Sequence, residues 1–340
     1  MIGADLARAV IVLGFLFVRD AGDLWLLYVL ATAQIVVSAT FNPAKNALLP
    51  LITGKGELLT ANALLSATWS TMLAVGAAAG GPAVDLFGTD AVFVMDAATY
   101  LVSAVFIARI AAPARAVRDP HEDRGGVVRS ALRQVADGWR YVRARPAVRR
   151  ITFAKACWSL GGGGLVFALA LLGDGLFPGA GTTGIGVLFA ARGLGTGLGP
   201  ILARAAFRDA RRWPMVLGAC IVASGLGYLG VAALADWRWA VAGLVVFAHA
   251  ASGANWVLST TLLQERSEDA FRGRVIATDW LTVTLVQSAS ILVASRLLEA
   301  GVGLTAVIVG LAGAQLATGL GWMMTVVPAE TRDEAVPTAA

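Results

Sequence analysis

Charged side chains interrupt several of the long apolar runs in this sequence. Asp5 and Arg8 are three residues apart, Asp96 lies about a third of the way into one run, and Arg192 is central in LFAARGLGTGLGP. A charge inside hydrocarbon costs about 2.5–3.5 kcal/mol on insertion scales, so each is a functional candidate. Asp96 could bind a proton or a cationic substrate, or pair with a Ser, Thr or Arg on a neighbouring helix. Arg192 is expected to face a cavity, where it pairs with an acid or meets an anionic substrate.

A second group consists of polar and aromatic residues inside apolar runs. Wide pockets for bulky amphipathic compounds are aromatic with few polar groups. Candidate cavity-lining residues of this kind are Gln34, Trp158, Asn255, Trp256, Trp280 and Gln287. Lys155 is about one turn into its run, and we interpret it as reaching the inner membrane surface with its ammonium group.

The composition indicates what surrounds these residues. The chain is 57% hydrophobic and 14% charged, with a mean hydropathy of +0.73, whereas soluble domains carry about 25% charged residues. The sequence therefore predicts an all-α polytopic membrane protein. Both cysteines lie in apolar runs and the two histidines are far apart, so we expect no disulfide, metal site or cofactor. The basic residues lie mostly in loops, so we expect no nucleic-acid partner.

Ten apolar runs are the expected membrane spans, and most reach the roughly 20 residues that a spanning helix needs. The first is the marginal one. The runs are approximately Ile2–Val18, Leu24–Phe41, Leu59–Pro82, Ala91–Ile110, Ile151–Leu172, Thr183–Ala206, Pro214–Leu234, Trp239–Leu262, Val275–Leu298 and Leu304–Val327.

The loops between these runs alternate in charge. One set carries most of the Lys and Arg, and the other is rich in Asp. Because basic loops stay on the cytoplasmic side, we expect both termini to be cytoplasmic. The expected organisation is a four-span block at 1–110, a cytoplasmic linker at 111–150, a six-span block at 151–327 and a cytoplasmic tail at 328–340.

The linker contains a helical pattern. Apolar residues recur at spacings of four and three, which is one face of a helix. They are Val128, Leu132, Val135, Trp139 and Val142, with Arg129, Arg133, Arg140 and Arg143 around them. This basic amphipathic helix is expected either to lie on the inner leaflet or to pack against the ends of the spans, and the two are compatible.

Several segments in a characteristic order resemble the major facilitator superfamily, closest to the branch of enterobactin exporters and macrolide-efflux-like proteins. They are FNPAKNALLPLI, LLTANALL, VFVMDAATYLVSAVFIARI, GWRYVRARPAVRR, ANWVLSTTLLQ and FRGRV. The similarity runs from Ala4 to about Val327. It implies two six-helix halves around a central cavity, and the ten runs are similar to family helices three to twelve. The first two helices and a Gly-, Asp- and Arg-rich gating loop would then precede Met1.

The resemblance also assigns roles to gating and packing residues. The pair Asp5 and Arg8 would stand at the cytoplasmic end of family helix three, where Arg8 could hold an acid at the inner gate. A reduced counterpart of the gating motif follows Gly199 and includes Arg211 and Arg212.

Glycines form the other part of the gating and packing set. MLAVGAAAGGP supplies Gly76, Gly80 and Gly81 where efflux members carry a Gly-Pro-x-x-Gly-Gly signature, with Ala77 in place of Pro. Small residues four apart also let two helices approach closely, so pure packing is the alternative. The alternating glycines after Arg192, with Gly193 and Gly197 among them, predict a helix that bends and packs closely.

The function that the resemblance implies is secondary active export of small amphipathic molecules, such as drug-like compounds or siderophores, from the bacterial inner membrane. Protons are the implied coupling ion, and the lipid bilayer is the other partner. The sequence has no Gly-x-x-x-x-Gly-Lys-Ser/Thr motif, so we expect no ATP hydrolysis. The alternatives are a membrane protein of non-transport function, such as an enzyme, and a transport-incompetent fragment that lacks the first two helices.

Overall fold

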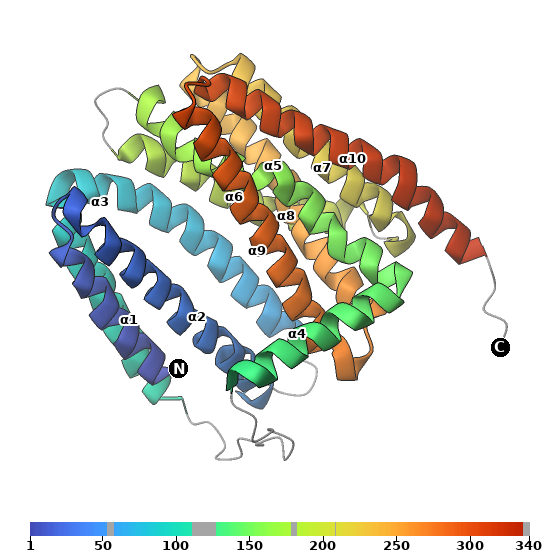
Figure 1. Ribbon diagram of the computed structural model, residues 1–340, viewed down its shortest axis with the longest axis horizontal. Coiled ribbons are helices and arrows are strands. Elements are labelled where there is room, and N and C mark those ends of the chain that lie inside the picture. Colours follow the sequence, from blue (N-terminus) through green and yellow to red (C-terminus); the bar gives the residue numbers. More distant parts are fainter. Residues whose placement is uncertain (53–57, 111–126, 178–181, 208, 336–340) are drawn as a thin grey trace. The chain divides into compact units, whose positions relative to one another are not determined.

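The structure, a computed structural model, describes residues 1–52, 58–110, 127–177, 182–207 and 209–335. This described part is helical and contains no strand (Figure 1). Its α-helices are α1 (Ile2–Gly14), α2 (Leu24–Ile52), α3 (Leu58–Ala108), α4 (Val127–Ala144), α5 (Pro146–Leu176), α6 (Thr183–Ala206), α7 (Trp213–Ala233), α8 (Arg238–Arg266), α9 (Asp269–Glu299) and α10 (Leu304–Ala335).

Eight segments among the described residues are long and apolar enough to cross a membrane. The count differs from ten runs for two reasons. Helix α1 has 13 residues, about 20 Å of helix, which is shorter than the roughly 30 Å hydrocarbon core. Helix α3 contains the third and fourth runs and is counted as one segment. Its helical geometry breaks between the two runs at Gly88, where φ is 79° and ψ is 162°. Only glycine adopts that backbone conformation readily, so the chain turns there between two spans. The predicted all-α polytopic fold is confirmed.

The chain divides into two compact units. Unit 1 comprises Met1–Trp69 and Ala79–Glu122, and unit 2 comprises Ser70–Ala78 and Asp123–Ala340. In unit 1, α1 packs against α2 and against the second part of α3. The rings of Phe15 and Phe93 stack there with centroids 5.4 Å apart.

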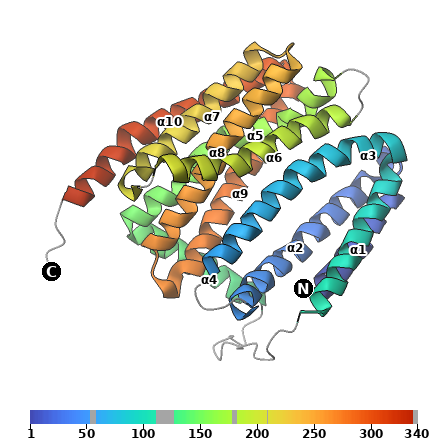
Figure 2. The same cartoon turned by 180° about the vertical axis from the view of Figure 1, so that it is seen from behind.

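Unit 2 contains helices α5–α10 (Figures 1 and 2). Their buried side chains form two apolar cores. One core includes Leu165 of α5, Leu188 of α6 and Val245 of α8. The other includes Ile151 of α5 and Trp322 of α10, and it takes up side chains from α4. The amphipathic helix is therefore part of the packed core of unit 2.

The contacts of α4 bear on the two expectations for the linker helix. Tyr141 and Val142 are buried, and Gly138 lies so close to α9 that a methyl group there would collide with the Arg274 carbonyl. Trp139, predicted for the apolar face, is instead 38% exposed. Packing against a span is thus observed, over a face centred on Gly138 and Val142. The side chains of Val128 and Leu132 lie outside the described residues.

The alternating glycines of α6 face two different neighbours. Gly195 and Gly199 lie against the backbone of α8 at Val246 and Ala250. Gly193 and Gly197 lie against Ala74 and Ser70, in the segment of α3 that belongs to unit 2. Residues four apart share one side of a helix, whereas residues two apart lie on nearly opposite sides. The spacing therefore gives α6 two close-packing faces.

The glycines of α3 behave differently. A Cβ atom at Gly76 or Gly80 would meet no heavy atom within 4 Å among the described residues. Among the described residues of its own unit, neither glycine is in close contact with another helix, and the packing alternative stays a prediction. Gly81 follows Gly80 in the same helix.

The substitution Gly199→Ala should destabilise the protein, because the added methyl group would collide with the Ala250 carbonyl of α8. Overpacking of this kind costs about 1–3 kcal/mol. Unfolding of the purified protein by titration with sodium dodecyl sulfate measures the change. Gly243→Ala is the matched control, since a methyl group at Gly243 of α8 meets nothing within 4 Å. Equal effects of the two substitutions would contradict the close packing of α6 on α8.

Candidate functional site

Asp5 and Arg8 form a buried ion pair in unit 1. Their side chains are 1% and 10% exposed, and Arg8 Nη1 lies 3.4 Å from Asp5 Oδ1. Ser103 of α3 donates a hydrogen bond of 2.7 Å to the other carboxylate oxygen of Asp5. Arg8 was predicted to hold an acid at a gate, and the acid beside it is Asp5 of its own helix. The pair joins α1 to the second part of α3.

Gln34 and Tyr100 extend this cluster. Gln34 Nε2 of α2 donates a hydrogen bond of 3.0 Å to the Tyr100 hydroxyl. The Arg8 guanidinium carbon lies 4.5 Å from the ring centroid of Phe41 and 5.7 Å from that of Tyr100. Arg8 Nε and Gln34 Oε1 are buried without hydrogen-bond partners. The cluster thus holds one spare donor and one spare acceptor.

Sequence reasoning missed Tyr100 and Ser103, although a signal was present. Asp96, Tyr100 and Ser103 follow spacings of four and three, which place them on one face of α3. Asp96 is exposed in unit 1, and its backbone carbonyl accepts a hydrogen bond from the Thr99 hydroxyl at 2.7 Å. No Lys or Arg forms an ion pair with Asp96 in the part of the chain that the structure describes.

A second buried ion pair joins α5 to α9 in unit 2. Lys155 Nζ lies 2.5 Å from Asp279 Oδ2, and the two side chains are 2% and 3% exposed. The expectation that Lys155 reaches the membrane surface is wrong, because its ammonium group is held by this carboxylate inside the bundle. Sequence reasoning missed Asp279, whose partner is 124 positions away.

Two tryptophans lie beside this pair. The ammonium nitrogen of Lys155 is 4.9 Å from the ring centroid of Trp256 on α8. The rings of Trp256 and Trp280 meet edge to face, with centroids 5.3 Å apart. Trp280 is 54% exposed. The aromatic pair therefore reaches from the buried charges to the surface of the unit.

Arg192 of α6 lies over the ring of Phe189, one turn earlier in the same helix. Its guanidinium carbon is 5.8 Å from the Phe189 ring centroid, and its buried Nε has no hydrogen-bond partner. The predicted acid does not pair with it among the described residues.

On α8, the buried His249 contacts the Tyr228 hydroxyl of α7 at 2.8 Å through Nε2 and Ser252 Oγ at 3.2 Å through Nδ1.

Three other predicted cavity residues pack inside unit 2. Trp158 Nε1 donates to Ser224 Oγ of α7 at 3.1 Å, and Asn255 Nδ2 donates to the Leu217 carbonyl of α7 at 3.3 Å. Both side chains are buried. The backbone of Gln287 lies in close contact with Gly163 of α5. Trp158 therefore connects α5 to α7, and Asn255 connects α8 to α7, each by a hydrogen bond. Their polar groups point into the helix bundle and not into an open cavity.

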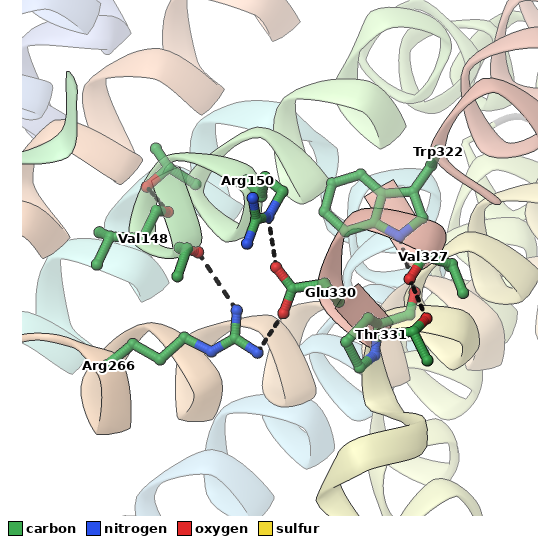
Figure 3. A network of polar contacts seen from close by, with 10 residues as sticks. Val148, Arg150, Arg266, Trp322, Val327, Glu330 and Thr331 are labelled. Carbon is green, nitrogen blue, oxygen red and sulfur yellow. Dashed lines mark hydrogen bonds and ion pairs between the residues drawn. The ribbon is translucent and has the colours of Figure 1, made fainter. Parts of the chain in front are cut away.

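Glu330 connects three helices at the end of unit 2 that carries most of its arginines. Arg150 Nε of α5 donates to Glu330 Oε1 at 2.5 Å, and Arg266 Nη2 of α8 lies 2.6 Å from Glu330 Oε2 (Figure 3). Arg266 also donates to the Ala147 carbonyl at 3.3 Å. The carboxylate is 8% exposed. One acid on α10 thus neutralises two arginines and holds the ends of α5 and α8 together.

One of the two predicted gating arginines, Arg211, lies near this network. Arg211 is exposed and lines a small pocket with residues of α7 and α10, among them Pro214, Val327 and Glu330. Arg212 is also exposed, and its Nε is 4.0 Å from Asp209 Oδ2. Exposed pairs of this kind contribute little to stability.

Glu330→Gln should lower the free energy of unfolding by about 3 kcal/mol. This is the low end for a broken buried ion pair, because Arg150 and Arg266 keep some exposure. The detergent unfolding titration measures the change. Glu299→Gln is the control, since the Glu299–Arg296 pair is exposed on both sides and should contribute only about 0.2–0.5 kcal/mol. Similar losses in both variants would show that Glu330 does not hold these helices.

Comparison with protein families places this chain of long apolar helices in a known family. A family model described as Major Facilitator Superfamily matches residues 1–294, most of the chain. A search of curated proteins found no match. The chain belongs to the major facilitator superfamily, a family of multi-pass membrane transporters.

Proposed function

We propose that the protein is a secondary active transporter that exports small amphipathic molecules across the bacterial inner membrane in exchange for protons. The family supplies the transport activity. The resemblance to the enterobactin-exporter and macrolide-efflux-like branch favours export of drug-like compounds or siderophores. The basic loops favour cytoplasmic termini, and therefore an orientation with the Glu330 network on the cytoplasmic side.

The observation that carries the proton-coupling proposal is the state of Asp96. Asp5, Asp279 and Glu330 each have a cationic partner. Asp96 forms no ion pair among the described residues, although it lies in an apolar part of α3. A carboxylate in that environment is best neutralised by a proton. Binding and release of this proton would couple its gradient to movement of the blocks at 1–110 and 151–327.

Asp96→Asn should abolish transport driven by a pH gradient, because an amide cannot exchange the proton. The measurement uses proteoliposomes with an acidic lumen and the permanently charged probe ethidium, with uncharged chloramphenicol as a second probe. The wild-type protein should accumulate at least one probe, and nigericin should remove the accumulation by collapsing the gradient.

Asp90→Asn is the matched control, because Asp90 is an exposed acid of the same helix that pairs with Arg19 at 2.8 Å. It should transport like the wild type. Asp96→Asn should still catalyse exchange of labelled for unlabelled probe. Full gradient-driven accumulation in Asp96→Asn would overturn the coupling role, and a wild-type protein that moves neither probe would count against export of such molecules.

A further inference from the structure

Three helices of unit 2 bring a carboxylate, an ammonium group and two indole rings to one place. Lys155 comes from α5, Trp256 from α8, and Asp279 and Trp280 from neighbouring positions of α9. Each lies well inside its helix, and each helix is a candidate membrane span. The cluster therefore lies in the membrane-spanning part of the unit.

The Lys155 ammonium group and the Asp279 carboxylate differ in how many of their hydrogen-bonding atoms have a partner. The Lys155 ammonium group donates to Asp279 Oδ2 and lies over the face of Trp256, so its charge is compensated on two sides. Asp279 Oδ1 is buried and has no hydrogen-bond partner among the residues that the structure describes. A buried carboxylate oxygen without a donor costs free energy. The group that the cluster lacks is therefore a donor, and a cationic N–H donor satisfies a carboxylate best.

The aromatic pair indicates what the donor is attached to. The Trp256 ring lies 4.9 Å from the ammonium nitrogen that Asp279 binds, and it meets the ring of Trp280, which keeps 54% of its surface exposed. Indole faces attract cations, and indole rings also pack against flat apolar groups. A ligand with one charged end and one aromatic body matches both parts of the cluster.

We propose that Asp279, Trp256 and Trp280 form a binding site for a protonated amine carried on an aromatic body. The ligand ammonium group takes the position of the Lys155 ammonium group, donates to both oxygens of Asp279 and lies against Trp256, while the aromatic body packs against Trp280. Lys155 is thus a built-in competitor that neutralises Asp279 when the site is empty. An anionic ligand does not fit, because it would meet the unsatisfied carboxylate oxygen Asp279 Oδ1 and be repelled by it. The inference rests on the proposed function, whose substrate class it names.

Equilibrium binding tests the site without transport. The probe is dansylcadaverine, a naphthalene derivative with a primary ammonium group, and its uncharged N-acetyl derivative is the matched ligand. Fluorescence anisotropy with the full chain in lipid nanodiscs measures both dissociation constants. The wild-type protein should prefer the amine over the acetylated ligand by about tenfold or more, since cation–π and charge-assisted contacts are lost on acetylation.

Lys155→Met should bind the amine about tenfold more tightly than the wild type, because the competing cation is removed. Asp279→Asn should bind it more weakly and lose the preference over the acetylated ligand. A purely structural ion pair predicts the opposite for Lys155→Met, namely weaker binding through loss of folded protein. Thermal stability measured with and without the amine separates the two effects.

A single variant that leaves one buried charge unpaired can fail to fold. The double variant Lys155→Met with Asp279→Asn avoids this problem because it removes both charges, so it tests the site in folded protein. It should bind both ligands equally. Glu330→Gln is the control, since it breaks a buried ion pair away from the tryptophans and should keep the amine preference. An unchanged preference in the double variant, or its absence in the wild type, would overturn the site. Transport without this preference would overturn the site alone, whereas binding without transport would overturn the proposed function alone.

Discussion

A charge inside a bilayer costs several kilocalories per mole unless an opposite charge lies beside it. The buried cations Arg8 and Lys155 and the half-buried Arg150 each meet a carboxylate. Asp5 binds within its own helix and reaches Ser103, whereas Asp279 and Glu330 connect helices that are distant in sequence. The need to neutralise charge therefore sets the register of α5 against α9 and of α10 against α5 and α8.

Apolar packing alone would fix these registers less well. Sliding one lipid-facing helix past another changes little hydrophobic free energy, since lipid tails are as apolar as the side chains. Glycine contacts restrict the sliding further, because Gly195 and Gly199 hold the backbone of α6 directly against α8. Together, close backbone contact sets the distance between helices and the ion pairs set their relative height.

The sequence predicted the parts of the fold that are determined locally. Length and hydropathy predicted the spans except the first, which corresponds to the short helix α1. The interval between the third and fourth runs coincides with the break at Gly88. Lys155 shows where local reasoning failed: its place near a helix start suggested a surface role, but its partner on α9 could not be known from spacing. Trp158 and Asn255 were predicted for a cavity, yet each buried N–H donates to an acceptor on α7, a helix that composition could not place beside them.

Polar groups inside the bundle differ in how much binding capacity they retain. Trp158 and Asn255 donate to α7 and so contribute to packing of the unit. Asp279 Oδ1, Gln34 Oε1, Arg8 Nε and Arg192 Nε are buried without a hydrogen-bond partner. A polar group that already has a hydrogen-bond partner gains little from a ligand. A buried polar group without a partner gains the hydrogen bond that it lacks in the folded protein. Among these four atoms, Asp279 Oδ1 is the one that belongs to a negatively charged group, so it has the strongest demand for a donor.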